Sequence, residues 1–185
     1  NTRLDTSQFH DCIHLLQRGD CHFLISYTHP DIAMHLPFEH FVSKLVLRDE
    51  LVPVTLPDSA GQPVDRLPGT EDDPVHYLAY SETSAIGRVV DQMISTTAEP
   101  LHLRRVFMSH MAQVLKAMSS EGRGTAWLPA SHLTKEFADG SLVPAGDERW
   151  KIPVEVRLIR SRDPLPDVSE ELWALIPTEE DTNWG

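Results

Sequence analysis

Two signals that together predict the fold class lie next to each other in the segment Val75-His76-Tyr77-Leu78-Ala79-Tyr80-Ser81-Glu82-Thr83-Ser84. Residues 75–80 have the character of a strand, and residues 81–84 contain several hydroxyl side chains of the kind that cap helices. Apolar residues then recur at helical spacing, namely Ile86, Val89, Val90 and Met93. The sequence therefore predicts a strand, a capping turn and a helix in that order, which is a building unit of α/β proteins.

A helix and a strand are also predicted before this segment. Thr6 or Ser7 is expected to cap a helix that Gly19 ends, and residues 21–27 form a nearly continuous apolar run. Such a run is typical of a strand covered on both faces. The apolar face of the helix would consist of Phe9, Ile13 and Leu16.

The order of strand, capping residue and helix recurs after residues 75–93. Residues 103–108 are predicted as a strand, Ser109 as a cap, and the following helix ends at residues 122–124. Shorter elements are expected at 125–129, 131–137 and 142–144, followed by a strand at 152–159 and a helix from Asp167 or Ser169. The methionines of these helices, Met93, Met111 and Met118, are expected to pack in the core.

One long extended segment is predicted at residues 41–56, where two apolar stretches flank the polar break Arg48-Asp49-Glu50. Such a break would let the chain leave one sheet and enter a second. Residues 57–74 are rich in Pro, Gly and Asp and are predicted as a surface loop. The pattern as a whole favours a mostly parallel α/β protein.

Composition excludes several classes of protein. The chain has 185 residues, 41% of them hydrophobic, and a formal net charge of −12, which is the wrong sign for a surface that binds nucleic acid. No apolar run approaches the ~20 residues of a membrane helix. With only Cys12 and Cys21 and no secretory signal, we expect a cytoplasmic protein. Because the chain opens at Asn1, we also expect it to be part of a longer protein.

A candidate ligand site follows from the predicted strand ends. Ligands of α/β sheets bind outside the carboxyl ends of strands, where helix N-termini present backbone N–H groups. The residues expected there are Tyr27, Thr28, Ser81, Thr83, Ser84, Met108, Ser109, His110, Leu128 and Pro129. One hydroxyl among residues 81–84 must cap the helix, and the others are available to a polar or anionic ligand; the two uses are weighed about evenly. Met108 would line the cleft, and oxidation of its thioether could report oxidant stress.

Catalytic and metal-binding signals are weak. The sequence has no phosphate-binding Gly loop, nucleophile elbow or C-x-x-C pair, so we expect no enzyme and no cofactor. His10 and His14 lie four residues apart and could face one metal ion, but no H-E-x-x-H motif accompanies them. A structural or solvent-exposed role is favoured roughly four to one over a metal site.

Several segments resemble the effector domain of LysR-type transcriptional regulators. Residues 15–25, 45–54 and 80–88 resemble its early signature, its first crossover strand and its mid-domain ligand segment. The most specific likeness is the run 106–109, the motif Glu121-Gly122-Arg123-Gly124-Thr125-Ala126-Trp127-Leu128-Pro129, and Gly140-Ser141-Leu142-Val143. Around Tyr80-Ser81, residues 106–111 and 127–129, the chain is also similar to the hypochlorite-responsive branch of the family.

The resemblance implies two Rossmann-like lobes joined by two crossover strands, as in type 2 periplasmic binding proteins. Lobe I would take residues 1–51 and 147–185, and lobe II residues 52–146. The cleft between them would bind the inducer. A winged helix-turn-helix and the first strand and helix of lobe I would precede this chain, so the candidate site is incomplete. His22 stands where the family usually has Asp, which puts any role for that Asp in doubt.

We therefore expect the inducer-sensing and oligomerisation domain of a LysR-type regulator, which binds a small polar or anionic effector or responds to an oxidant. The resemblance implies a homodimer or homotetramer that acts on promoter DNA through the preceding domain, with RNA polymerase as a candidate partner and no membrane. The alternative is a solute-binding protein of the same fold that serves a transporter. A metal-dependent enzyme built on the histidines is a third hypothesis.

Overall fold

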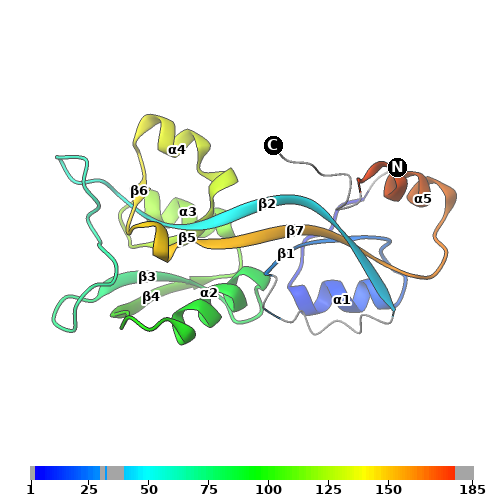
Figure 1. Ribbon diagram of the computed structural model, residues 1–185, viewed down its shortest axis with the longest axis horizontal. Helices are drawn as coiled ribbons and strands as arrows, with labels where there is room; N and C mark the ends of the chain where they lie inside the picture. The colour runs from blue at the N-terminus through cyan, green and yellow to red at the C-terminus, as the bar shows by residue number, and fades with distance from the viewer. Residues whose placement is uncertain (1–2, 30–31, 33–39, 178–185) are drawn as a thin grey trace. The chain divides into compact units, whose positions relative to one another are not determined.

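The computed structural model describes residues 3–29, 32 and 40–177 (Figure 1). Their order along the chain is α1 (Phe9–Gln17), β1 (Leu24–Thr28), β2 (Phe41–Thr55), β3 (Val75–Tyr80), α2 (Ala85–Thr96), β4 (Leu103–Ser109), α3 (Ala112–Ser120), β5 (Ala126–Pro129), a 3-10 helix (Ala130–His132), α4 (Thr134–Asp139), β6 (Val143–Pro144), a second 3-10 helix (Glu148–Trp150), β7 (Ile152–Ser161) and α5 (Asp167–Leu175).

The strands form a five-stranded sheet and a two-stranded sheet. The larger sheet has the order β1-β7-β2-β5, with β6 paired to β2, and the pairings of β1 with β7 and of β2 with β5 and β6 are antiparallel. β3 and β4 form a parallel pair. The prediction of a mostly parallel protein was therefore wrong. Apolar periodicity distinguishes a strand from a helix, but it carries no information on which neighbour the strand pairs with or in which direction.

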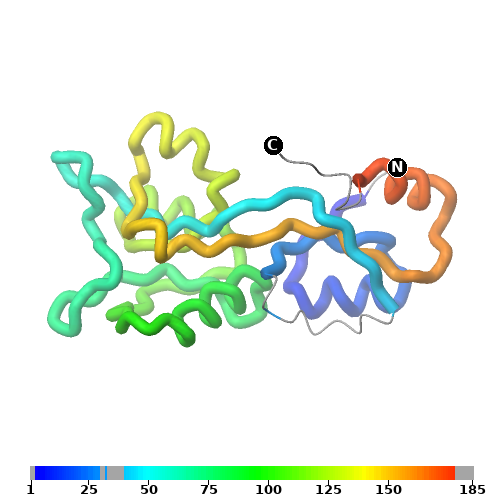
Figure 2. Tube along the Cα trace, in the orientation of Figure 1, coloured from blue at the N-terminus to red at the C-terminus, as the bar shows by residue number. Residues whose placement is uncertain are grey.

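The chain divides into two compact units, Asn1–Arg48 with Val154–Gly185 and Asp49–Pro153. Two strands contribute residues to both units, β2 at the first division and β7 at the second; they lie side by side as the cyan and orange segments of Figure 2. The predicted long extended segment is thus a single 15-residue strand, β2, and its polar break lies at the first division. The outer ends of the first unit, residues 1–2 and 178–185, lie outside the described residues.

α1 builds the core of the first unit. Ile13 and Leu16 are buried against Leu24, Phe41 and Ile159, and the half-buried Phe9, Cys12 and Cys21 pack around them. The residue before the helix is Gln8 and makes no side-chain cap, so the predicted capping by Thr6 or Ser7 was wrong. The hydroxyl of Ser7 donates instead to Asp11, at 3.2 Å.

β1 is shorter and less covered than its apolar sequence predicts. It begins at Leu24 rather than at Cys21, and its burial alternates along the strand. Ile25 is 61% exposed because it points away from the core that Leu24 enters. The expectation of a strand covered on both faces was therefore wrong for this element.

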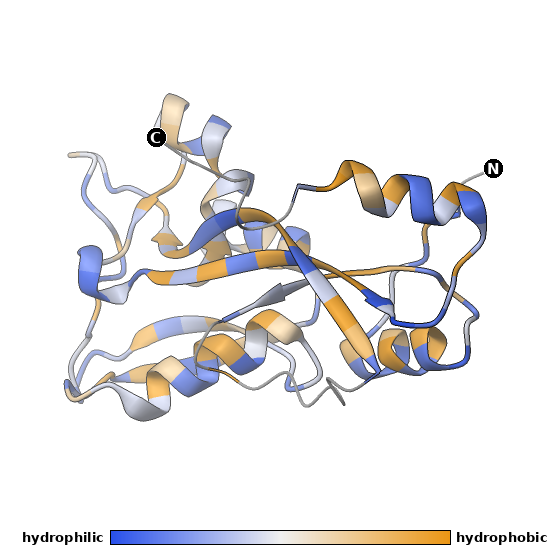
Figure 3. Ribbon diagram, turned by 45° about the vertical axis from the view of Figure 1, so that its right-hand side comes forward, coloured by the Kyte–Doolittle hydropathy of each residue, from blue (hydrophilic) through white to orange (hydrophobic). Residues whose placement is uncertain are grey.

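The second unit has its core around β5. Trp127 and Trp150 are almost completely buried, and the indole N–H of Trp127 donates to the Trp150 carbonyl oxygen at 2.8 Å. Tyr77 of β3 meets the Trp127 ring edge-on at a centroid distance of 5.6 Å, and burial raises the pKa of its phenol. α2 shows alternating hydrophobic and hydrophilic bands in Figure 3, and its buried residues are Ile86, Gly87, Val89 and Val90.

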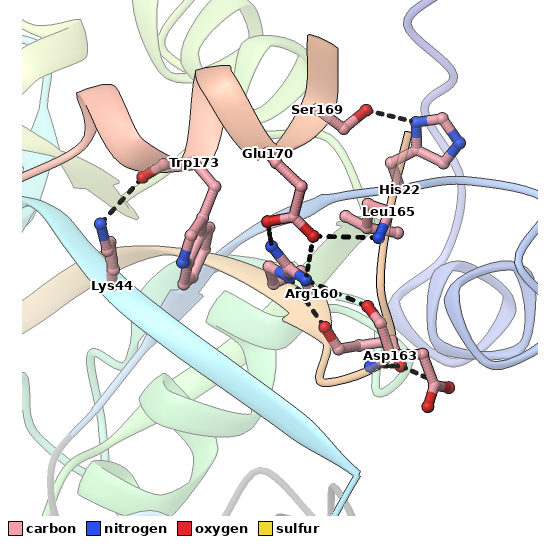
Figure 4. A network of polar contacts seen from close by, with 9 residues as sticks. His22, Lys44, Arg160, Asp163, Leu165, Ser169, Glu170 and Trp173 are labelled. Carbon is pink, nitrogen blue, oxygen red and sulfur yellow. Dashed lines mark hydrogen bonds and ion pairs between the residues drawn. The ribbon is translucent and has the colours of Figure 1, made fainter. Parts of the chain in front are cut away.

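A polar network holds α5 in the first unit (Figure 4). The buried guanidinium of Arg160 donates to both carboxylate oxygens of Glu170, one of them at 2.9 Å, and also to the carbonyl oxygen of Asp163. The hydrogen bonds from Arg160, and then the one from the Leu165 backbone N–H, lower the pKa of Glu170 to about 2. The ion pair therefore persists in mild acid. Trp173 of α5 also stacks on Phe23, whereas Leu172 and Leu175 stay exposed.

Candidate functional site

The carboxyl ends of β3 and β4 meet at one edge of the second unit. The two strands are parallel, with Tyr80 opposite Ser109 and Ala79 opposite Met108. The backbone N–H of Ser81 donates to the Ser109 carbonyl oxygen at 3.0 Å, which joins the two segments that follow the strands. The residues predicted to lie together after these strands are thus neighbours in space.

Ser84 caps α2, as the sequence predicts for one of these hydroxyls. Its side-chain oxygen accepts from the backbone N–H of Gly87 at 3.3 Å. The hydroxyls of Ser81 and Thr83 lie 3.1 Å apart and share a hydrogen bond with each other. Because one cap satisfies the start of the helix, these two hydroxyls are not needed for capping and can turn to a ligand.

The segment after β4 differs from its prediction. α3 begins at Ala112 after Met111, so Ser109 is not its N-cap; its hydroxyl accepts from the backbone N–H of Met111 at 3.2 Å in the turn before the helix. Met111 is 44% exposed, which makes its predicted place in the core wrong. Met108 is 50% exposed and His110 is exposed, so both side chains are open to solvent.

Leu128 and Pro129 lie at the end of β5, as predicted. β5 belongs to the larger sheet, whereas the other site residues of this unit lie at or after the ends of β3 and β4 of the smaller one. Leu128 and Pro129 lie opposite Val52 and Leu51 of β2 in an antiparallel pairing. Leu128 is 1% exposed, so its side chain belongs to the core and only its backbone lies near the strand end. The next segment is fixed by Ser131, whose hydroxyl donates to Asp49 at 2.7 Å.

Tyr27 and Thr28 belong to the first unit and are described within it. Both lie on β1, opposite Val156 and Glu155 of β7. Thr28 is buried, and its hydroxyl donates to the Glu155 carbonyl oxygen at 3.3 Å. A role of this hydroxyl toward a ligand would therefore require that this weak bond be given up.

Arg88 of α2 is a charged residue of the segment 80–88 that the predicted site residues do not include. It follows Ser84 by four residues, which places both on one face of α2, and its backbone N–H donates to the Ser84 carbonyl oxygen at 3.2 Å. Burial lowers the pKa of its half-buried guanidinium. A basic residue one turn after a capping serine is the sequence signal that could have identified it.

The described histidines do not gather into a set of three ligating side chains. Within the part of the chain that the structure describes, no group of three or more His, Cys, Asp or Glu side chains could hold a metal ion. His10 and His14 do face each other on α1, with their Nε2 atoms 2.9 Å apart. Among the described residues, no helix is long and apolar enough to cross a membrane.

Known proteins match this chain over most of its length. Residues 1–179 match the family described as the LysR substrate binding domain. The HTH-type transcriptional regulator YjiE of Escherichia coli (strain K12) is 26% identical over 165 residues, which are 88% of this chain and 51% of that protein. The HTH domain-truncated transcriptional regulator QseD of Escherichia coli O157:H7 is also 26% identical, over 88% of this chain and 64% of that protein. The chain thus spans about half to two thirds of the length of these relatives.

Solved structures of LysR-type regulators are also similar to this chain. The full-length structure of HypT from Salmonella typhimurium, a hypochlorite-specific LysR-type regulator, has a TM-score of 0.81 and 25% identity over 93% of this chain and 56% of that one. The apo-form regulatory domain of HypT has a TM-score of 0.80 and 26% identity over 93% of this chain and 78% of that one. They confirm the predicted α/β fold of two Rossmann-like lobes. The chain belongs to the LysR substrate-binding-domain family, which is the effector-binding domain of LysR-type regulators.

Proposed function

We propose that this domain binds a small polar or anionic effector through the hydroxyls that follow β3 and β4. The observation that carries the proposal is the pair of Ser81 and Thr83, 3.1 Å apart, beside a helix start that Ser84 already caps. Arg88, on the same face of α2 as Ser84, supplies a positive charge that favours an anion. The lobe boundaries are proposed to lie near residues 51 and 147.

Binding would act on transcription through a population shift. An effector that prefers one arrangement of lobes or subunits moves the equilibrium by no more than its difference in binding free energy between the two states. We infer that the whole protein acts in the cytoplasm as a homodimer or homotetramer and meets promoter DNA through a helix-turn-helix domain outside this sequence. The name of YjiE, an HTH-type regulator of which the match covers 51%, supports this inference.

Replacing Ser81 by alanine and Thr83 by valine together is expected to weaken effector binding about tenfold or more, because two hydroxyl partners of the ligand are lost. The free energy of unfolding should change little, since Ser84 still caps α2. A thermal-shift screen of small carboxylates on the wild-type chain identifies the probe, and calorimetry then compares the variants. Ser95→Ala, an exposed hydroxyl at the far end of α2, is the matched control. Equal binding by the double variant would remove these hydroxyls from the site.

An oxidant response is a second candidate, favoured by Met108 and by the similarity to full-length HypT, a hypochlorite-specific regulator. The thioether of Met108 is half exposed at the end of β4. Hypochlorous acid would transfer its oxygen atom to this sulfur, giving a sulfoxide, chloride and a proton. The sulfoxide is polar and would change the packing of the segment that joins β4 to α3.

If Met108 is the oxidant sensor, substoichiometric hypochlorite is expected to convert it to its sulfoxide before Met111. The two residues are 50% and 44% exposed, so exposure alone would oxidise them at similar rates. Peptide mapping by mass spectrometry measures the ratio, and the half-buried Met118 serves as an internal reference. Equal oxidation of Met108 and Met111, together with stabilisation by one small carboxylate, would favour the metabolite effector over the oxidant.

A further inference from the structure

His10 and His14 form an exposed pair on α1 that the effector function does not use. Their Nε2 atoms lie 2.9 Å apart, and their rings meet edge-on with centroids 4.4 Å apart. Residues at positions i and i+4 of a helix are neighbours on its surface, which explains why the two rings meet. Burial of Ile13 and Leu16 in the core of the first unit holds the backbone that carries them.

The two nitrogens share a hydrogen bond, and they are close enough for one metal ion to take the place of the bridging proton. Metal–imidazole bonds are about 2.0 Å long, so two ligands at right angles place their nitrogens roughly 2.8 Å apart. A tetrahedral zinc ion with the same bonds needs roughly 3.3 Å. Tetragonal coordination with nitrogen ligands is typical of Cu(II), which also binds most tightly among the divalent first-row metals.

We propose that His10 and His14 together bind one Cu(II) ion through their Nε2 atoms. No third His, Cys, Asp or Glu side chain joins them in the described residues, so water would fill the other coordination positions. Asp11 accepts a hydrogen bond from Ser7, and the Cys12 thiol donates to the Ser7 carbonyl oxygen while it packs on the core. Both neighbouring side chains are therefore engaged elsewhere.

Such a site would stabilise α1, because the ion links two successive turns of the helix. A ligand that binds the folded chain and not the unfolded one raises the free energy of unfolding in proportion to the logarithm of its concentration. The proposal is independent of the effector site, which lies on the second unit and shares no residue with this pair.

Titration of the full chain with Cu(II) alone, near pH 7, tests the proposal. We expect one ion per chain with two nitrogen ligands in its electron paramagnetic resonance spectrum, a raised melting temperature, and weaker binding of Zn(II). His14→Ala should lower the Cu(II) affinity at least tenfold, because the second imidazole then no longer binds at a high effective concentration. Alanine favours the helix, so the variant is expected to fold.

The matched control keeps the number of histidines and changes only their spacing. In His14→Ala/Gln17→His, the exposed position 17 carries the second imidazole. Positions 10 and 17 are about 10 Å apart along the helix axis, too far to share one ion. If this control binds Cu(II) as tightly as the wild type, or if Zn(II) binds the wild type as tightly as Cu(II), the proposal is overturned.

Discussion

Trp127→Ala is expected to lower the free energy of unfolding by about 3–5 kcal/mol, the usual cost of removing a fully buried indole. Trp127 is 0% exposed, and its side chain bridges the two sheets of the second unit. It extends from β5 in the larger sheet to the edge contact with Tyr77 of β3, and its N–H satisfies the carbonyl oxygen of Trp150. Alanine would leave a cavity between the sheets and an unpartnered buried carbonyl.

Urea denaturation followed by circular dichroism measures this loss. Trp127→Phe keeps a ring against Tyr77 but removes the indole N–H together with part of the ring system. Its expected cost of about 1–3 kcal/mol therefore combines the lost hydrogen bond with a smaller cavity. Phe137→Ala is the matched control for removal of an aromatic side chain, since Phe137 is 39% exposed. A loss for Trp127→Ala no greater than that for Phe137→Ala would contradict the assignment of Trp127 to the centre of this core.

Local patterns predicted the middle of the chain well. The sequence places a strand at residues 75–80 and a cap within 81–84, and the structure has β3 at Val75–Tyr80 and Ser84 as the cap of α2. Both signals are local, because apolar periodicity and a capping hydroxyl act within one or two turns. Strand partners are not local, which is why the antiparallel larger sheet escaped prediction.

The sequence predicted where the backbone of the candidate site lies better than it predicted which side chains are exposed or act as caps. The sequence could place Ser81, Ser84 and Ser109 after two strands, but it could not distinguish the cap of α3 from the turn before it. Leu128 sits at a strand end as expected, and yet its side chain is buried, because β5 is covered along its whole length. Arg88 was not among the predicted site residues, although its position one turn after the capping serine could have identified it; only the structure shows that it is half buried.

Gly87 is a helix position where substitution by alanine is expected to destabilise the protein rather than stabilise it. In the interior of a helix, Gly→Ala usually stabilises by about 1 kcal/mol. A Cβ on Gly87 would lie 2.6 Å from the Ser81 carbonyl oxygen and 2.9 Å from the Tyr80 Cβ, both shorter than a van der Waals contact. The backbone oxygen cannot move without shifting the end of β3. Gly87→Ala is therefore expected to destabilise the second unit by about 1–3 kcal/mol, the usual cost of overpacking.

The effect of Gly87→Ala should extend to the effector. To relieve the contact, the first turn of α2 must move away from Ser81, which separates the capping serine and Arg88 from the hydroxyls of the strand end. We expect both a lower urea midpoint and weaker binding of the carboxylate found by the screen. Gln92→Ala, at an exposed position of the same helix, should raise stability slightly and leave binding unchanged. A Gly87→Ala variant more stable than the wild type would mean that α2 does not approach β3 so closely. The hydroxyls that follow β3 would then not be held beside the first turn of α2, and the proposed site would be contradicted.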